Sequence, residues 1–363
     1  MIKRWLLVIM CIIFISIGIT GCGDSAVVNE QTDTQKIVDM AGRELIIPKD
    51  IKKVYCTSPT GTVFMYTLAP EKLAGWNNKL TESEKEYILP KYHNLPVLGR
   101  WFGKRSTANP EEILKIKPDL IISMGDVNDM AISSAEEMEK QIGIPVVLMD
   151  SSINKLGKAY RFAGDILDKK DRAEDLALYC EQTIEEVTSK VSQIQPENRK
   201  RVYYAEGPRG LQTDSKGSPH TEVLRLAGGI NVATFPVKTG FGRENISIEQ
   251  LLLWDPDFIL MNSDFTNDDK NSITKIIRNE WQILNAVKNG NVYKIPQYPF
   301  NWFDRPLSVN RIIGIKWVAN VLYPDIYKID IEKEVKNFYR KFYFYELSDE
   351  KVMEILDNTK VNN

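Results

Sequence analysis

The sequence predicts an α/β fold with two Rossmann-like lobes, each built on a parallel sheet, joined by a single long rigid helix. Three observations lead to this prediction. The segment "NPEEILKIKPDLII" at 109–122 returns as "SIEQLLLWDPDFIL" at 247–260, and each copy has the pattern of a short helix, a Pro-Asp stop and an apolar strand. Strand and helix patterns alternate along the chain, which favours parallel sheets. Helical periodicity from 155 to 195 separates the two copies without a flexible linker.

The composition fits a globular chain of more than one domain. At 363 residues with 43% hydrophobic content the chain can bury a sizeable core. The net charge of −2 argues against a nucleic-acid partner. Six segments are predicted: a signal peptide at 1–21, a lipidated cysteine with a flexible tether at 22–36, an N-terminal α/β lobe at 37–153, connecting helices at 154–196, a C-terminal α/β lobe at 197–327 and a helical extension at 328–363.

The first 22 residues have the pattern of an export signal. Lys3 and Arg4 precede an uncharged apolar run at 6–19, which is shorter than the about 20 residues that a membrane span needs. The closing "ITGC" resembles the lipobox of bacterial lipoproteins, in which the cysteine, here Cys22, is lipidated and becomes the mature N-terminus. This implies an exported protein, lipid-anchored on the extracytoplasmic face of the cell membrane. An ordinary signal peptide with a chance cysteine is the alternative.

The first lobe is expected to begin with a hairpin and to continue with alternating strands and helices. "IVDMAGRELIIP" at 37–48 gives the hairpin, with Gly42 at its turn. "KKVYC" at 52–56 has the pattern of a buried strand, and a helix is expected over 62–68. After the first repeated unit, "IGIPVVLMD" at 142–150 supplies another strand.

The second lobe repeats the order of the first after a helical middle section. The charged "DKKD" at 168–171 is expected to interrupt the helical stretch, leaving a long second helix that ends before Pro196. "KRVYYAEGP" at 200–208 then mirrors "KKVYCTSP" at 52–59, and "NGNVYKIP" at 289–296 mirrors the last strand of the first lobe. Three corresponding segments in the same order predict two equivalent lobes.

Several of these motifs together resemble the periplasmic-binding-protein family that delivers ferric siderophores, haem and vitamin B12 to ABC importers. They are "VDMAGRELIIP", "NPEEILKIKPDLII", "LRLAGGINVA" and "ISIEQLLLWDPDFIL", and the resemblance covers residues 36–327. It implies a class III substrate-binding lipoprotein that captures a small-molecule metal chelate, here an iron(III) chelate. Its implied partners are an ABC permease homodimer and the cytoplasmic ATPase of that permease.

The resemblance also implies a docking role for Glu111 and Glu249. In the family one glutamate per lobe pairs with arginines of the permease subunits. These two residues lie at the same place in the two repeats, seven positions before the proline of each Pro-Asp. A two-fold symmetric partner calls for equivalent charges on both lobes. The alternative is that each glutamate only complements the dipole of its own helix.

The ligand is expected in a cleft between the lobes, among the loops that follow the strands. Arginines next to aromatic side chains suit a bulky, flat, negatively charged ligand, although such clusters also occur in ordinary loop packing. The candidate ligand-binding residues are Ser58, Thr60, Arg100, Trp101, Arg105, Glu206, Arg209, His220, Tyr298, Trp302, Phe303 and Arg305. Haem, cobalamin, a nickel chelate and molybdate would use the same architecture and remain alternatives.

A directly bound metal ion is not expected, because the chain has only two histidines, His93 and His220, in different lobes. His220 is a candidate to complete the coordination of a metal already held by a chelator, with a solvent-facing histidine as the alternative. Cys56 and Cys180 are expected to be buried thiols, with a disulfide between them as the alternative. No catalytic set or nucleotide motif points to an enzyme, so an exported enzyme on the same fold is the less favoured hypothesis. The N-terminal lipid is the one attached group predicted, and the extension at 328–363 is expected to pack on the second lobe.

Overall fold

The computed structural model describes residues 33–101, 106–236, 242–262, 280–357 and 359–361. From Thr34 onward the chain forms one unit. The signal peptide, the lipid attachment at Cys22 and the ligand role of Arg105 are predictions that lie outside the described residues. Within the described residues, none of the helices combines the length and the apolar character that a membrane crossing requires.

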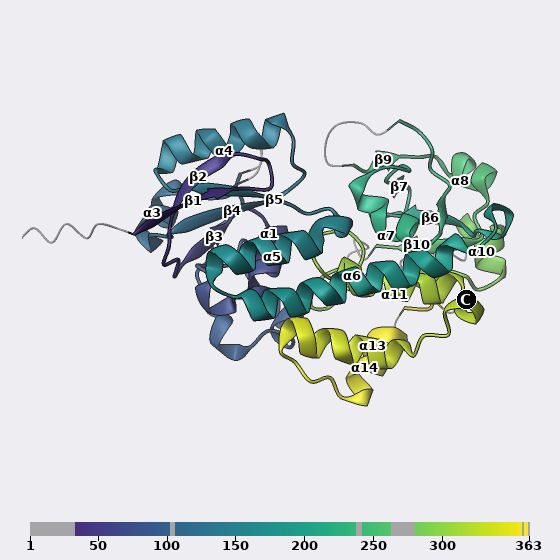
Figure 1. Ribbon diagram of the computed structural model, residues 1–363. Coiled ribbons are helices and arrows are strands. Elements are labelled where there is room, and N and C mark those ends of the chain that lie inside the picture. Colours follow the sequence, from purple (N-terminus) through teal and green to yellow (C-terminus); the bar gives the residue numbers. More distant parts are fainter. Residues whose placement is uncertain (1–32, 102–105, 237–241, 263–279, 358, 362–363) are drawn as a thin grey trace, which may run out of the picture. The chain divides into compact units, whose positions relative to one another are not determined.

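The first lobe is built on a parallel three-stranded sheet with a hairpin beside it (Figure 1). Its elements in chain order are β1 (Thr34–Val38), β2 (Glu44–Pro48), β3 (Val54–Cys56), α1 (Pro59–Leu68), η1 (Pro70–Lys72), α2 (Glu82–Lys85), η2 (Pro90–Tyr92), α3 (Pro110–Ile116), β4 (Leu120–Gly125), α4 (Asp129–Ile142) and β5 (Val146–Asp150). The sheet order is β3-β4-β5, and β1 pairs with β2 in an antiparallel hairpin whose turn contains Gly42, with a φ of 82°. The predicted hairpin and strands are confirmed.

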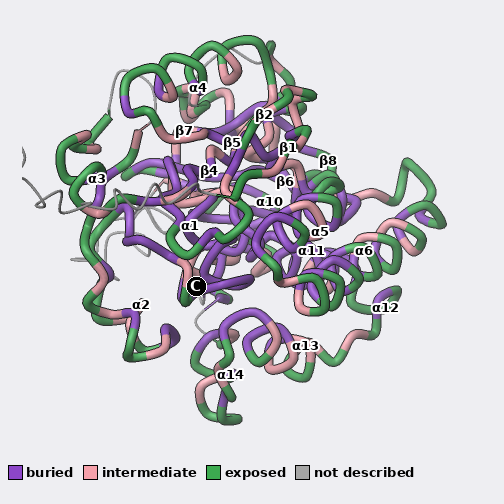
Figure 2. Tube along the Cα trace, turned by 60° about the vertical axis from the view of Figure 1, so that its left-hand side comes forward, coloured by how far each residue is buried: buried purple, intermediate pink, exposed green. Residues whose placement is uncertain are grey.

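Helix α4 shows how the sequence pattern places a helix on the sheet. Ala135, Met138 and Ile142 recur at helical spacing and are buried, while most of its other residues are exposed (Figure 2). Asn128 caps its first turn by accepting a hydrogen bond from the Ala131 N–H, 3.0 Å away. One apolar face therefore covers the first sheet.

The second lobe repeats the plan of the first. Its elements are β6 (Arg201–Ala205), β7 (Gln212–Thr213), η6 (Pro219–Thr221), α7 (Glu222–Leu226), β8 (Ile230–Asn231), β9 (Glu244–Asn245), α8 (Ile248–Trp254), β10 (Phe258–Met261), α10 (Asn285–Lys288), β11 (Val292–Lys294), α11 (Arg311–Leu322) and α12 (Pro324–Tyr327). The main sheet has the order β11-β10-β6-β8, all parallel, and β7 pairs antiparallel with β9. Strands β6, β10 and β11 correspond to β3, β4 and β5, which confirms the predicted repetition.

The connecting section is helical, as predicted. It consists of η4 (Ile153–Lys155), α5 (Leu156–Leu167), α6 (Lys170–Ser192) and η5 (Pro196–Asn198). Helix α5 ends where Asp168 adopts a left-handed conformation with a φ of 54°, inside the predicted charged interruption. Helix α6 has 23 residues and is about 35 Å long. It supplies the long rigid connection between the two lobes.

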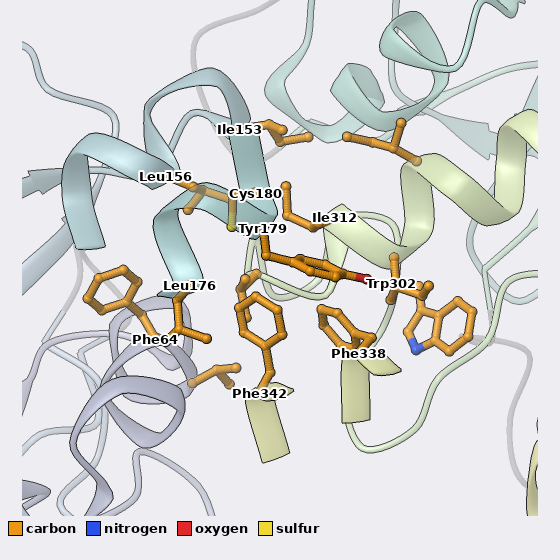
Figure 3. Close-up of a cluster of buried hydrophobic side chains, with 14 of the residues drawn as sticks. Phe64, Ile153, Leu156, Leu176, Tyr179, Cys180, Trp302, Ile312, Phe338 and Phe342 are labelled. Atoms are coloured by element: carbon orange, nitrogen blue, oxygen red, sulfur yellow. The ribbon is translucent and has the colours of Figure 1, made fainter. Parts of the chain in front are cut away.

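The core lies along the buried face of α6. Leu176, Tyr179 and Cys180 point from this face into a cluster with Phe338 and Phe342 (Figure 3). The Tyr179 and Phe342 rings meet edge to face with their centroids 5.4 Å apart. Cys56 and Cys180 are both buried free thiols, as expected, and burial raises the pKa of each.

The C-terminal extension contacts more of the molecule than the sequence suggests. It comprises α13 (Ile331–Phe338), the π-helical turn η8 (Tyr339–Tyr343) and α14 (Asp349–Asp357). The Tyr343 and Phe344 rings lie 6.0 and 6.3 Å from Tyr66 in α1, and Phe342 lies 6.3 Å from Tyr160 in α5. The prediction that the extension packs on the second lobe is therefore too narrow. Its closely spaced aromatic residues cover apolar surface of the first lobe and of the connecting helices as well.

Candidate ligand-binding site

The two predicted docking glutamates lie on equivalent helices. Asn109 caps α3 by accepting from the Glu111 N–H at 3.0 Å, and Ser247 caps α8 by accepting from the Gln250 N–H at 3.2 Å. Glu111 and Glu249 stand in the first turns of these helices, and both are exposed. Hydrogen bonds from its own backbone N–H and from Ser247 hold the pKa of Glu249 below its usual value. Both carboxylates are therefore accessible to a partner.

The Pro-Asp of each repeat has a structural role of its own. The Asp119 carboxylate accepts from the backbone N–H groups of Lys52 and Lys53, each at 2.8 Å. In the second lobe, the Asp257 carboxylate accepts from the Arg201 N–H, also at 2.8 Å. Each aspartate thus ties the start of its own strand to the start of the neighbouring strand.

Ser58 and Thr60 lie where β3 leads into α1. Ser58 is the N-terminal residue flanking α1, and its Oγ donates to the Met124 carbonyl at the end of β4, 3.3 Å away. Both residues are half-buried. They occupy the carboxyl edge of the first sheet, where a ligand of an open α/β sheet is expected.

Arg100 and Trp101 follow at the same edge. The Arg100 side chain is exposed, whereas Trp101 is half-buried and packs against the apolar residues of the first lobe. The Trp101 N–H donates to the Thr57 carbonyl at 2.9 Å. This backbone bond fixes the main chain at Trp101 beside the loop that carries Ser58, so the two predicted loops are neighbours.

A cluster of buried charges lies at the carboxyl end of β6 in the second lobe. The Arg305 guanidinium reaches three carboxylates: Nε lies 3.1 Å from Glu206 Oε1 and 3.1 Å from Asp304 Oδ2, and Nη2 lies 2.8 Å from Asp214 Oδ2. Arg243 Nε donates to the same Glu206 oxygen at 2.9 Å. Glu206 itself is completely buried. The prediction that Glu206 contacts a ligand is therefore corrected: it lies beneath the two arginines and holds them.

Burial changes the protonation of this cluster. The pKa of Glu206 is raised to about 8, mainly by burial and then by the negative charge of Asp304, against the opposing effect of Arg305. The Tyr204 pKa is also raised, by burial and by the same aspartate. At neutral pH Glu206 therefore tends to be protonated, which lowers the number of negative charges around Arg305.

His220 joins this cluster from the first turn of η6. Its Nδ1 lies 3.2 Å from Asp304 Oδ2, and 14% of its side chain is exposed. The other Asp304 oxygen accepts from the Tyr204 hydroxyl at 2.7 Å. Asp214, His220 and Asp304 each offer a ligand atom, and these three atoms lie within 4.8 Å of one another. The fold thus assembles a possible donor set for a metal ion around a single histidine, which the histidine count alone does not suggest.

The aromatic residues of the 298–306 loop are divided between surface and core. Tyr298 is 42% exposed and stacks on Tyr87 with the ring centroids 6.1 Å apart. Trp302 and Phe303 are fully buried, and Trp302 Nε1 donates to the Tyr298 carbonyl at 3.1 Å. Contrary to the prediction, the Trp302 and Phe303 rings do not face a cleft, because the loop turns both into the main hydrophobic core, where Figure 3 shows Trp302.

Arg209 lies apart from the buried cluster. Its Nη2 donates to Glu280 Oε2 at 2.9 Å, and 64% of its side chain is exposed. An exposed pair of this kind contributes little to stability. Arg209 is thus accessible, although the structure does not bring it into contact with the other candidate residues.

Two charged residues that the sequence pattern does not single out connect the lobes. The Glu222 carboxylate accepts from the Ile153 N–H at 3.2 Å and from Arg311 Nη1 at 3.0 Å. Arg311 is almost completely buried, and it also donates to the Ser151 carbonyl of the first lobe. A cavity of about 310 Å³ lies beside this contact, with walls from both lobes that include Asp126. The sequence does show that Glu222 is a charged residue at the start of a helix. Its partner Arg311 lies 89 positions away, so no local pattern predicts that the two residues pair.

Two repeated lobes, a stiff helical connection and ligand candidates at the carboxyl ends of strands in both lobes are the features of a solute-binding protein. The family model described as periplasmic binding protein matches residues 58–299. The chain belongs to this family, which consists of solute-binding proteins rather than enzymes.

Three relatives illustrate the similarity. A solved ABC transporter solute binding protein from Sulfurospirillum deleyianum is 32% identical with a TM-score of 0.81, and the alignment covers 89% of this chain and 99% of that one. The Fe(3+)-citrate-binding protein YfmC of Bacillus subtilis is 24% identical over 192 residues, 53% of this chain and 58% of that protein. The high-affinity heme uptake system protein IsdE of Staphylococcus aureus is 24% identical over 216 residues, 58% of this chain and 69% of that protein. The alignment with the Bacillus protein thus spans little more than half of its length.

Proposed function

We propose that this protein is the substrate-binding lipoprotein of an ABC importer, which captures an iron(III) chelate outside the cytoplasmic membrane and delivers it to a permease. The observation that carries the proposal is the exposed first-turn glutamate on each of two equivalent helices, Glu111 on α3 and Glu249 on α8. A permease homodimer with its ATPase offers two equivalent contact surfaces, and matched acidic groups suit them. A lipid on Cys22 would keep the protein at the membrane surface.

The side chains at the lobe edges support a negatively charged chelate as the ligand. Arg100 presents an exposed guanidinium beside the half-buried Trp101 in the first lobe. In the second lobe Arg305 keeps a quarter of its side chain exposed while buried carboxylates orient it. Arginine binds carboxylate or catecholate oxygens in a planar, bidentate geometry, and ring faces cover apolar chelator surface. The name of the Bacillus relative, a binder of iron(III) citrate, agrees with this ligand class.

Haem, cobalamin, a nickel chelate and molybdate are the alternative ligands on this architecture. The name of the Staphylococcus relative supports haem among them. With Trp302 and Phe303 buried in the core, the described residues offer fewer ring faces to a flat macrocycle than the sequence predicts. This observation favours the smaller, more polar iron(III) chelate.

The proposal is tested by tryptophan fluorescence of the mature protein, titrated with ferric citrate, a ferric siderophore, haem, cobalamin and nickel-histidine. Saturable quenching by a ferric chelate is expected, with about tenfold weaker binding in Arg100→Ala because one charge-assisted contact is lost. Arg340→Ala is the matched control, since Arg340 is exposed in the C-terminal extension, where it donates to Asn337, and the affinity of this variant should equal that of the unchanged protein. Quenching by haem alone would show that the ligand is haem and not a ferric chelate. No response to any ligand would contradict the proposal.

A further inference from the structure

The histidine and two aspartates of the second lobe converge on one point although they come from three separate segments. Asp214 follows β7, His220 stands in η6, and Asp304 lies in the loop before α11. One donor atom from each lies within 4.8 Å of the other two. The group is mainly buried: the side chains of Asp214 and Asp304 are 2% and 0% exposed. Carboxylates enclosed in this way require a compensating partner.

Two of the donor atoms face each other without a hydrogen bond. His220 Nδ1 and Asp304 Oδ2 are 3.2 Å apart, and within the described residues neither atom takes part in a hydrogen bond, although Arg305 Nε forms an ion pair with Asp304 Oδ2 at 3.1 Å. A ring nitrogen lone pair and a carboxylate oxygen repel each other unless a proton or a cation lies between them. Two ligands of one zinc-like ion, each about 2.0–2.1 Å from the metal, also lie about 3 Å from each other. The observed separation is therefore suitable for a shared metal ion.

Neighbouring groups hold the three side chains in place. Tyr204 donates to the second oxygen of Asp304 at 2.7 Å, and the Ser218 hydroxyl donates to Asp214 Oδ1 at 2.9 Å. The same Ser218 oxygen accepts from the His220 backbone N–H at 3.2 Å. Such outer partners orient the ligands of protein metal sites. The donor atoms are thus positioned before any ion binds.

The charge of the surroundings does not oppose a cation. Glu206, Asp214 and Asp304 stand against two guanidinium groups, those of Arg243 and Arg305, in this cluster. The three carboxylates outnumber the two guanidinium groups. Arg305 is the competing cation at both Asp304 and Asp214, and its side chain is 25% exposed. It can therefore move toward solvent when a metal ion takes its place.

We propose that Asp214, His220 and Asp304 bind a divalent transition-metal ion directly. One imidazole nitrogen with two carboxylate oxygens suits zinc, nickel or cobalt, and three protein ligands leave a coordination position open for water or a chelator atom. The inference deepens the nickel-chelate alternative of the proposed function rather than the iron(III) chelate, and it rests on the proposed function in one respect, that the metal arrives with its chelator. The protein would then hold the metal itself as well as the organic part of the ligand.

The experiment uses the mature protein, stripped of metal with EDTA and dialysed, and cobalt(II) chloride as the probe. We expect one cobalt ion per chain with visible absorption bands of a low-symmetry site. His220→Ala and Asp304→Asn should weaken binding at least about tenfold. His93→Ala is the matched control, because His93 is the other histidine of the chain and its ring hydrogen-bonds to the Ile88 carbonyl in the first lobe. Circular dichroism establishes that each variant is folded.

The outcomes separate this inference from the proposed function. Absence of saturable cobalt binding by folded protein, or equal binding in His220→Ala, overturns the metal site. If a ferric chelate still quenches fluorescence in that case, the proposed function stands. Cobalt binding that is lost in His220→Ala and kept in His93→Ala supports the metal site, whichever chelate is transported.

Discussion

Asp150 organises the turn between the last strand of the first lobe and the connecting helices. Its carboxylate accepts from the Ser152 N–H and from Lys155 Nζ, both at 2.8 Å. Burial raises its pKa, but the bonds from Lys155 and Ser152 outweigh burial and bring the pKa below the usual 3.8. This turn presents the Ser151 carbonyl to Arg311 of the second lobe. One aspartate therefore supports the contact between the lobes.

The first prediction concerns this carboxylate. Because its folded pKa is lower than its unfolded pKa, the unfolded chain binds more protons at acid pH. The stabilisation is present above the usual pKa of 3.8 and is lost as pH falls through the folded value. Asp150→Asn should lower the free energy of unfolding by about 1 kcal/mol at neutral pH. Below pH 4 the free energy of unfolding should fall less in the variant than in the unchanged protein. Urea unfolding at several pH values measures this, and an unchanged acid dependence would contradict it.

At the scale of elements, the repeated unit combines two different functions in fourteen residues. Its helix presents a glutamate to solvent, and its Pro-Asp fastens the following strand to the neighbouring one. The buried Ile113 and Leu251 stand at matching positions and hold α3 and α8 on their lobes. The two copies are alike in both the attachment of the helix and the exposed charge.

Removal of either Pro-Asp carboxylate should destabilise the protein. Asp119→Ala and Asp257→Ala are each expected to lower the free energy of unfolding by about 1–2 kcal/mol, since each leaves strand-end N–H groups without a charged acceptor. Asp165→Ala is the control, because its exposed pair with Lys170, 3.5 Å apart, should contribute little. Thermal and urea unfolding measure the effect. Equal stability of all three variants would show that the hydrogen bonds of Asp119 and Asp257 do not contribute to the free energy of unfolding.

At the scale of the whole molecule, the lobes are joined both by α6 and by charged contacts. Glu222 and Arg311 link the second lobe to the turn after β5, and the C-terminal extension packs on the first lobe and on α5. A stiff helix and these contacts favour limited movement between lobes rather than wide hinge closure. The spacing between α3 and α8 should accordingly change little on ligand binding.

This arrangement predicts the effect of reversing the two exposed glutamates. Glu111→Lys with Glu249→Lys should abolish uptake through the permease, because both acidic contacts become repulsive, while ligand affinity of the purified protein stays unchanged. Glu112→Lys is the matched control, as Glu112 lies beside Glu111 and already pairs with Lys115. Uptake by cells and fluorescence titration of the purified variants are the two measurements. Weakened ligand binding in the double variant would argue against docking.

Periodic patterns predicted the elements well because they depend on neighbouring residues. The hairpin, the parallel strands, the interruption at Asp168 and the long α6 all follow from local spacing of apolar, charged and turn residues. The contacts of the extension were harder to predict, since its aromatic residues had several apolar surfaces to cover. Burial of Trp302 was not predictable from its loop, because the side of the chain that faces the core depends on residues distant in sequence.

The sequence by itself determined the twofold plan of the protein, its helical connection and the positions of Glu111 and Glu249, because each is encoded within a short segment. Only the tertiary structure decided which side chains meet. It buried Glu206 beneath two arginines, brought His220 to Asp304 and linked Glu222 to Arg311. These groupings arise where loops from separate strands converge at one edge of a sheet, and the distance between such loops is set by packing rather than by sequence spacing.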